Sequence, residues 1–116
     1  MTYSLGFLSI EIPDLLNNPY VIQPVSLNNQ LYFFEYRWNI RYGRAFLSIY
    51  TKENNAPKYL IKNICLLPQI SLSDHIKEDS WNGDLTFALK LNRNASDYRQ
   101  DTINIDFDIK YFTEEE

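Results

Sequence analysis

The sequence predicts an all-β protein, either a small antiparallel β-sandwich or a β-barrel of about seven strands, with one or two short helical turns. Apolar and polar residues alternate with a period of two in several segments, and helical periodicity is scarce. Hydrophobic residues make up 45% of the 116 residues, which is enough to fill one compact core. We therefore expect a single β domain over residues 1–116, with an acidic tail at 112–116.

The first half of the chain supplies the expected elements up to a central hairpin. In chain order these are a strand at 2–12, a helical turn at 13–16, and strands at 32–40, 45–51 and 58–66. The central turn is Arg41-Tyr42-Gly43-Arg44, where Gly43 can take a positive φ. A second turn is expected at 53–56.

The second half predicts two more strands, at 85–91 and 103–111. The latter alternates most regularly, with apolar residues at every second position from Ile103 to Tyr111. Asp106 and Asp108 fall between them and are expected on a solvated face. Residues 92–102 are polar and predict a long exposed loop. Ser73 is expected to cap a short turn around residues 74–76.

Charge and chain features exclude several classes of protein. The net charge is −4, and Arg37, Arg41 and Arg44 lie close to Glu35, so they indicate a mixed solvated or interface surface. Without a basic stripe we expect no nucleic-acid recognition. The sequence contains no run of about 20 apolar residues, so we expect no membrane insertion. The single cysteine, Cys65, lies in an apolar run and is expected to be a buried, reduced thiol.

No group of residues predicts catalysis, a cofactor or a metal ion. His75 is the only histidine, and beside Asp74 in a polar turn it is expected to be a surface residue. One histidine and one cysteine cannot complete a zinc site. The aspartates do not follow the spacing of a calcium loop. We expect no enzyme.

Aromatic residues are more frequent than one core of this size requires, at 16% of the chain. Near the start of the strand at 32–40 both faces are apolar, with Leu31 and Phe33 on one side and Tyr32 and Phe34 on the other. Either the domain buries both faces, or one face packs on a neighbouring subunit, where Tyr, Trp and Arg are enriched. The sequence leaves both alternatives open.

Residues 31–72 resemble the baseplate plug family of contractile bacteriophage tails. The shared pattern is an aromatic strand ending in Trp38-Asn39, a following Arg41, a hairpin return at 45–50 and a leucine-rich segment at 61–72. Residues 81–85, 99–103 and the last strand extend the similarity to about residues 20–112. Asn63 and Gln69 stand where the family carries glycines, and Phe46 where it often carries Trp.

The resemblance implies a structural component of a tail baseplate, present in several copies around the tail axis near the hub and tube. Its partners would be other baseplate, hub and tail-tube proteins. It would be located in the virion after assembly in the host cytoplasm. From residue type and turn position, the candidate interface residues are Trp38, Arg41, Tyr42, Arg44 and Trp81. The alternative is a β-sandwich binding module for a carbohydrate or a peptide.

Overall fold

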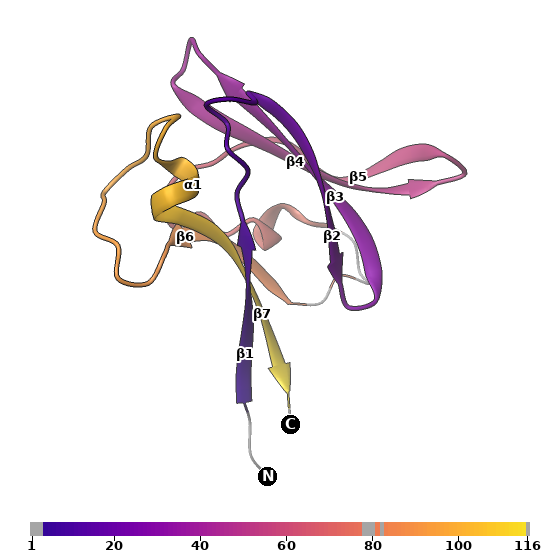
Figure 1. The fold of residues 1–116 in the computed structure, drawn as a ribbon. Coiled ribbons are helices and arrows are strands. Elements are labelled where there is room, and N and C mark those ends of the chain that lie inside the picture. The colour runs from indigo at the N-terminus through magenta and orange to yellow at the C-terminus, as the bar shows by residue number, and fades with distance from the viewer. Residues whose placement is uncertain (1–3, 78–80, 82, 116) are drawn as a thin grey trace.

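The computed structural model describes residues 4–77, 81 and 83–115, and it forms two antiparallel sheets (Figure 1). One sheet has the order β2-β3-β4-β5 and the other has the order β1-β7-β6. The strands are β1 (Ser4–Glu11), β2 (Tyr20–Leu27), β3 (Gln30–Asn39), β4 (Arg44–Glu53), β5 (Ala56–Cys65), β6 (Asp84–Leu89) and β7 (Phe107–Glu115). A 3₁₀ turn, η1 (Ser73–His75), and one helical turn, α1 (Ile103–Asp106), complete the fold. The all-β prediction is confirmed, and the sandwich is the correct alternative.

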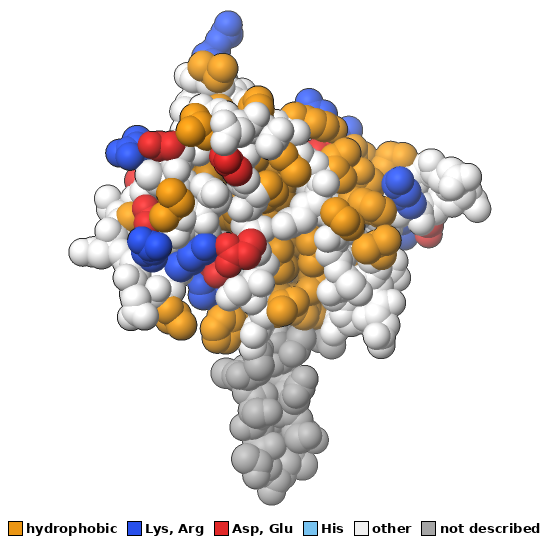
Figure 2. Space-filling model, viewed as in Figure 1, with side chains coloured by type: hydrophobic (Ala, Val, Ile, Leu, Met, Phe, Trp, Pro, Cys, Tyr) orange, Lys and Arg blue, Asp and Glu red, His pale blue; other side chains and the backbone are white. Residues whose placement is uncertain are grey.

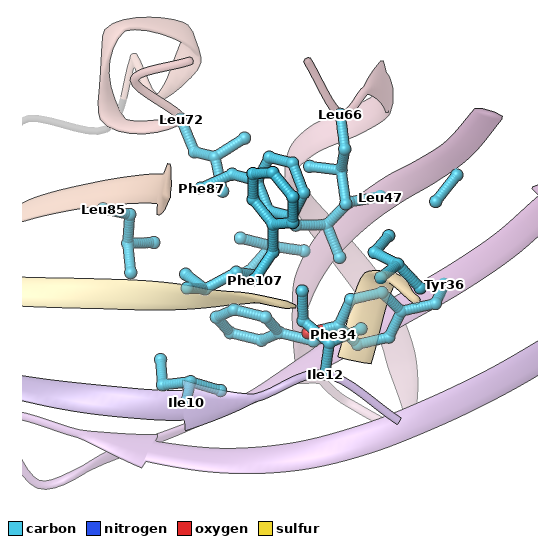
Figure 3. Close-up of a cluster of buried hydrophobic side chains, with 14 of the residues drawn as sticks. Ile10, Ile12, Phe34, Tyr36, Leu47, Leu66, Leu72, Leu85, Phe87 and Phe107 are labelled. Atoms are coloured by element: carbon cyan, nitrogen blue, oxygen red, sulfur yellow. The ribbon is translucent and has the colours of Figure 1, made fainter. Parts of the chain in front are cut away.

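The core lies between the two sheets and is built from alternate residues of each strand. Figure 3 shows Phe34, Tyr36 and Leu47 of the larger sheet packing toward Phe87 and Phe107 of the smaller one. All five side chains are almost completely buried. Each contributes roughly 1.5–3 kcal/mol by leaving water. This shared core holds both sheets in one unit.

Hairpin turns connect the four strands of the larger sheet in sequence. Asn54 and Asn55 have φ values of +52° and +64°, which is the left-handed pair that suits a two-residue turn. The turn predicted at 53–56 is therefore confirmed. The turn at 41–44 is confirmed too, with Gly43 at φ +63° and its amide donating to the Asn39 carbonyl at 2.8 Å.

Strand β2 is an element that the sequence analysis missed. It pairs antiparallel with β3 from Tyr20, opposite Arg37, to Leu27, opposite Gln30. Pro24 lies inside β2 and is tolerated because β2 is an edge strand, where one side of the backbone has no ladder partner. The proline concealed an alternation that is otherwise regular.

Gln69 and Gly83 both occupy left-handed backbone positions. Gln69 has φ +70° and follows Pro68 in a turn closed by the Ile70 amide donating to the Leu67 carbonyl at 3.0 Å, the arrangement of a type II turn. Gly83 has φ +105°, and a Cβ there would lie 2.4 Å from the ring of Tyr111. The backbone at these two turns therefore favours glycine, and only Gly83 supplies it.

We expect Gln69→Gly to raise the free energy of unfolding by about 0.5 to 1 kcal/mol. The left-handed conformation costs an L-residue about 1–2 kcal/mol, and part of that gain is offset by the greater freedom of glycine in the unfolded chain. Urea titration followed by tryptophan fluorescence measures the change, with Gln69→Ala as the control that keeps the strain. A glycine variant no more stable than the alanine variant would refute this account.

The segment 103–111 is only partly a strand, which corrects the sequence prediction. Residues 103–106 form α1, because the amides of Ile103 and Asp106 donate to the carbonyls of Arg99 and Thr102 at 3.0 and 2.9 Å. Ile103 still enters the core, but Ile105 is exposed. β7 then runs to Glu115 and pairs with Ser4 of β1, into the residues predicted as an acidic tail.

Asp108 is buried together with Lys110, although the alternation predicted a solvated face at Asp108. The Lys110 ammonium donates to Asp108 Oδ1 at 2.5 Å and to the Leu89 carbonyl at 3.2 Å. The two side chains are 5% and 11% exposed. Pairing removes the need for water at both charges. The outer side of β7 thus holds an ion pair where solvent was expected.

Smaller expectations met mixed outcomes. Residues 92–102 contain no strand or helix, as predicted, but Tyr98 within them is buried. Ser73 makes no capping bond for η1 and donates to Asp84 at 2.5 Å. Cys65 is half-buried and not fully enclosed.

Candidate protein–protein interface

The side of the larger sheet that faces away from the core carries an apolar patch. Strand pairing places Phe33 beside Tyr50, and Tyr50 beside Tyr59, on this side. The rings stack or tilt against each other at centroid distances of 5.3 Å. We call this surface the aromatic face, and its members are Tyr20, Ile22, Phe33, Phe46, Tyr50 and Tyr59.

Much of the aromatic face remains in contact with solvent. Tyr20, Ile22 and Tyr59 are 49%, 42% and 39% exposed. Figure 2 shows hydrophobic side chains gathered over the part of the surface that β3, β4 and β5 occupy in Figure 1. Contiguous exposed apolar surface of this kind marks a site of interaction. Of the two alternatives left open for the strand at 32–40, the arrangement supports the one in which the domain buries one face and presents the other.

A carboxylate lies in the floor of the aromatic face. Glu35 is 7% exposed, accepts a hydrogen bond from the Tyr20 hydroxyl, and lies 3.7 Å from the Arg37 guanidinium. That hydrogen bond raises the pKa of Tyr20 above its ordinary value. Burial, and then the charge of Glu35, raise the pKa of Tyr50. The Tyr20 hydroxyl thus stays protonated and donates to Glu35.

At the end nearest the β3–β4 turn, the face opens into a groove of about 380 Å³. Its lining residues are Arg37, Trp38, Asn39, Tyr42, Phe46 and Asn63. Tyr42 is 70% exposed, and its ring centroid lies 6.3 Å from that of Phe46. The groove combines apolar walls, a guanidinium and two amides, a mixture typical of anchor sites in protein interfaces.

The structure brings together some of the predicted interface residues. Trp38 and Tyr42 line the groove, and Arg41 is exposed at the same turn. Arg44 instead makes a two-pronged ion pair with Asp97 at 2.6 and 2.8 Å and lies over the Tyr98 ring. This pairing lowers the pKa of Asp97. Arg44 therefore anchors a loop of its own domain.

Trp81 lies apart from the other four. Its ring makes edge contacts with Tyr32 and Tyr111 at 5.6 and 5.9 Å, and its indole N–H donates to the Gly83 carbonyl at 3.1 Å. It packs against the core from the end of β3 opposite the groove. Its role in an interface stays a prediction.

Sequence reasoning missed most of the aromatic face. Tyr20 and Ile22 were missed because β2 was missed. Tyr50 and Tyr59 belong to strands that were predicted, but the pairing register that sets these two residues side by side was not. The signal that could have found them is the apolar character of both sides of β3 at Phe33 and Phe34. Burial of Phe34 in the core explains the apolar residues on one side of the strand, and those on the other side, such as Phe33, need a different explanation.

Within the described residues, no three His, Cys, Asp or Glu side chains gather as a metal site would require. Over the same part of the chain, none of the helical segments has the length and hydrophobicity of a membrane-spanning helix.

The fold and its surface define a class of protein: a small β-sandwich that presents aromatic side chains on the outside of one sheet, as interaction proteins do. The chain belongs to the family described as Cyanophage baseplate Pam3 plug gp18, whose family model matches residues 9–114. The resemblance found in the sequence is thereby confirmed. No curated protein and no solved structure matches the chain.

Family membership makes this chain a structural component of a phage baseplate and hence of the virion tail. It implies association with other baseplate components and argues against an enzyme.

Proposed function

We propose that this chain packs near the central hub and tube of a contractile tail, in multiple copies around the tail axis, through protein–protein contacts. The observation that carries the proposal is the aromatic face with its groove, where aromatic and aliphatic side chains from four neighbouring strands leave apolar surface in water. Assembly in the host cytoplasm, where thiols stay reduced, suits a chain with one half-buried cysteine.

The first test is light scattering of the purified chain, alone and mixed with the tube, hub and other baseplate proteins of the same tail. A defined complex with one of them supports the proposal. A monomer that binds none of them would overturn it, and binding to a glycan array would then favour the carbohydrate-binding alternative.

We expect Tyr42→Ala to weaken such a complex about tenfold or more while leaving the fold intact. An exposed aromatic at a groove is the residue type that dominates interface energies, and truncating an exposed side chain costs only about 0.5 kcal/mol of stability or less. Leu91→Ala is the matched control, since Leu91 is 75% exposed and lies beyond β6, away from the groove. Equal affinities for the two variants would remove Tyr42 from the interface.

A further inference from the structure

The aromatic face has a charge pattern that restricts what can cover it. Three cationic side chains lie over its rings: Arg37 over Tyr20 at 4.9 Å, Lys52 over Phe33 at 4.8 Å, and Lys62 over Tyr59 at 5.0 Å. Each of these cations belongs to an exposed residue. Although the chain has a net charge of −4, three cations lie over the rings of this face.

The one carboxylate of the aromatic face does not cancel this pattern at the surface. Glu35 lies in the floor, 7% exposed, where it accepts a hydrogen bond from the Tyr20 hydroxyl. It lies 3.7 Å from the Arg37 guanidinium and so offsets that charge, but among the residues that the structure describes no ion pair of this kind joins it to Lys52 or Lys62. The cations lie above the rings, where an approaching surface would meet them first. The face therefore presents apolar rings with cations over them.

A second copy joined through this same face is a poor match. A two-fold contact places the same patch on both sides, so both sides would bring the same cations, and the carboxylate of Glu35 is buried. Interfaces instead set opposite charges across from each other, which selects partners and speeds association.

We infer that the aromatic face docks an apolar surface of a different protein whose margin carries carboxylates. This inference rests on the proposed function and names the surface and partner chemistry that it would use. The partner's apolar groups would cover Tyr20, Ile22 and Tyr59, which are the exposed members of the face. The partner's Asp or Glu side chains would pair with Lys52 and Lys62.

The experiment compares the unaltered chain with the double variant Lys52→Glu/Lys62→Glu. Each is titrated with the purified tube, hub and baseplate proteins of the same tail, at about 0.1 M and about 1 M salt, where the screening length falls from about 10 Å to about 3 Å. The matched control is Lys77→Glu/Arg93→Glu, which makes the same charge change at exposed residues of other segments. Thermal melting verifies that all three proteins fold.

We expect the face variant to bind its partner at least tenfold more weakly than the control variant at low salt, with a smaller difference at high salt. Equal affinities of the two variants would overturn the inference and leave the proposed function standing. Self-association of the unaltered chain that the face variant abolishes would identify a second copy as the occupant, and it would also overturn the inference. If the unaltered chain binds none of the tail proteins, the proposed function itself fails.

Discussion

Replacing Tyr98 with alanine is expected to lower the free energy of unfolding by about 3–5 kcal/mol, the usual cost of deleting a buried aromatic ring. Tyr98 is 5% exposed and joins the two sheets. Its ring contacts Phe87 at 5.5 Å and Phe107 at 6.0 Å, both in the smaller sheet, and Trp38 at 6.0 Å in the larger one. This loss is a large fraction of the free energy of unfolding, which is only about 5–15 kcal/mol in total for a small domain.

The Tyr98 hydroxyl makes a separable contribution. It donates to the Leu66 carbonyl at 2.6 Å and accepts from the Ala45 amide at 3.1 Å. We expect Tyr98→Phe to cost about 1–3 kcal/mol, because both backbone groups would then be buried without this partner. The phenylalanine variant should therefore fall between the unaltered chain and the alanine variant.

Urea unfolding of the three proteins, followed by circular dichroism, tests this order. Tyr42→Phe is the control for removing a hydroxyl from an exposed tyrosine and should change stability little. A Tyr98→Ala protein within 1 kcal/mol of the unaltered chain, on the scale of an ordinary surface change, would contradict the role given to this residue.

Tyr98 also shows where sequence reasoning ends. The stretch 92–102 has loop composition and is a loop, so local chemistry predicted its backbone correctly. Nothing in the pattern states that one tyrosine turns back to bridge the sheets, because its partners Ala45 and Leu66 are far away in sequence. Strand β6 and the central hairpin were predictable since their alternation is local.

The error at residues 103–106 has a different cause. An alternating segment buries every second residue as a strand, but one helical turn also buries a single residue, here Ile103. Four residues are too few for the period to separate the two structures. The hydrogen bonds that the carbonyls of Arg99 and Thr102 accept decide between them, and these bonds depend on a turn that the sequence does not display.

The candidate interface was predictable in part. Tyr42 and Trp38 were identified because they are aromatic and lie in or just before a turn with a glycine, which is a local signal. The aromatic face requires the pairing of β2, β3, β4 and β5, since it is assembled from one or two residues of each strand. The surplus of aromatic residues left such a surface as one of two open alternatives, and the strand register determines where it lies.

The second large effect is expected at the buried ion pair of β7. Asp108→Ala should destabilise the domain by about 3–5 kcal/mol, because Lys110 would keep a buried charge without its counterion. Lys110→Met should cost a similar amount, since it leaves the carboxylate of Asp108 without its cation. Urea unfolding at neutral pH measures both changes.

The double variant Asp108→Leu/Lys110→Met separates pairing from packing. When both charges are removed, no buried charge is left without a counterion, and the cost of taking the two charges out of water disappears. We therefore expect the double variant to be about as stable as the unaltered chain, or up to about 4 kcal/mol more stable. The two single losses would then fail to add, and the double-mutant cycle gives their coupling directly. Additive losses would mean that each charge is solvated independently, and the outer side of β7 would then be the wet surface that its alternation first predicted.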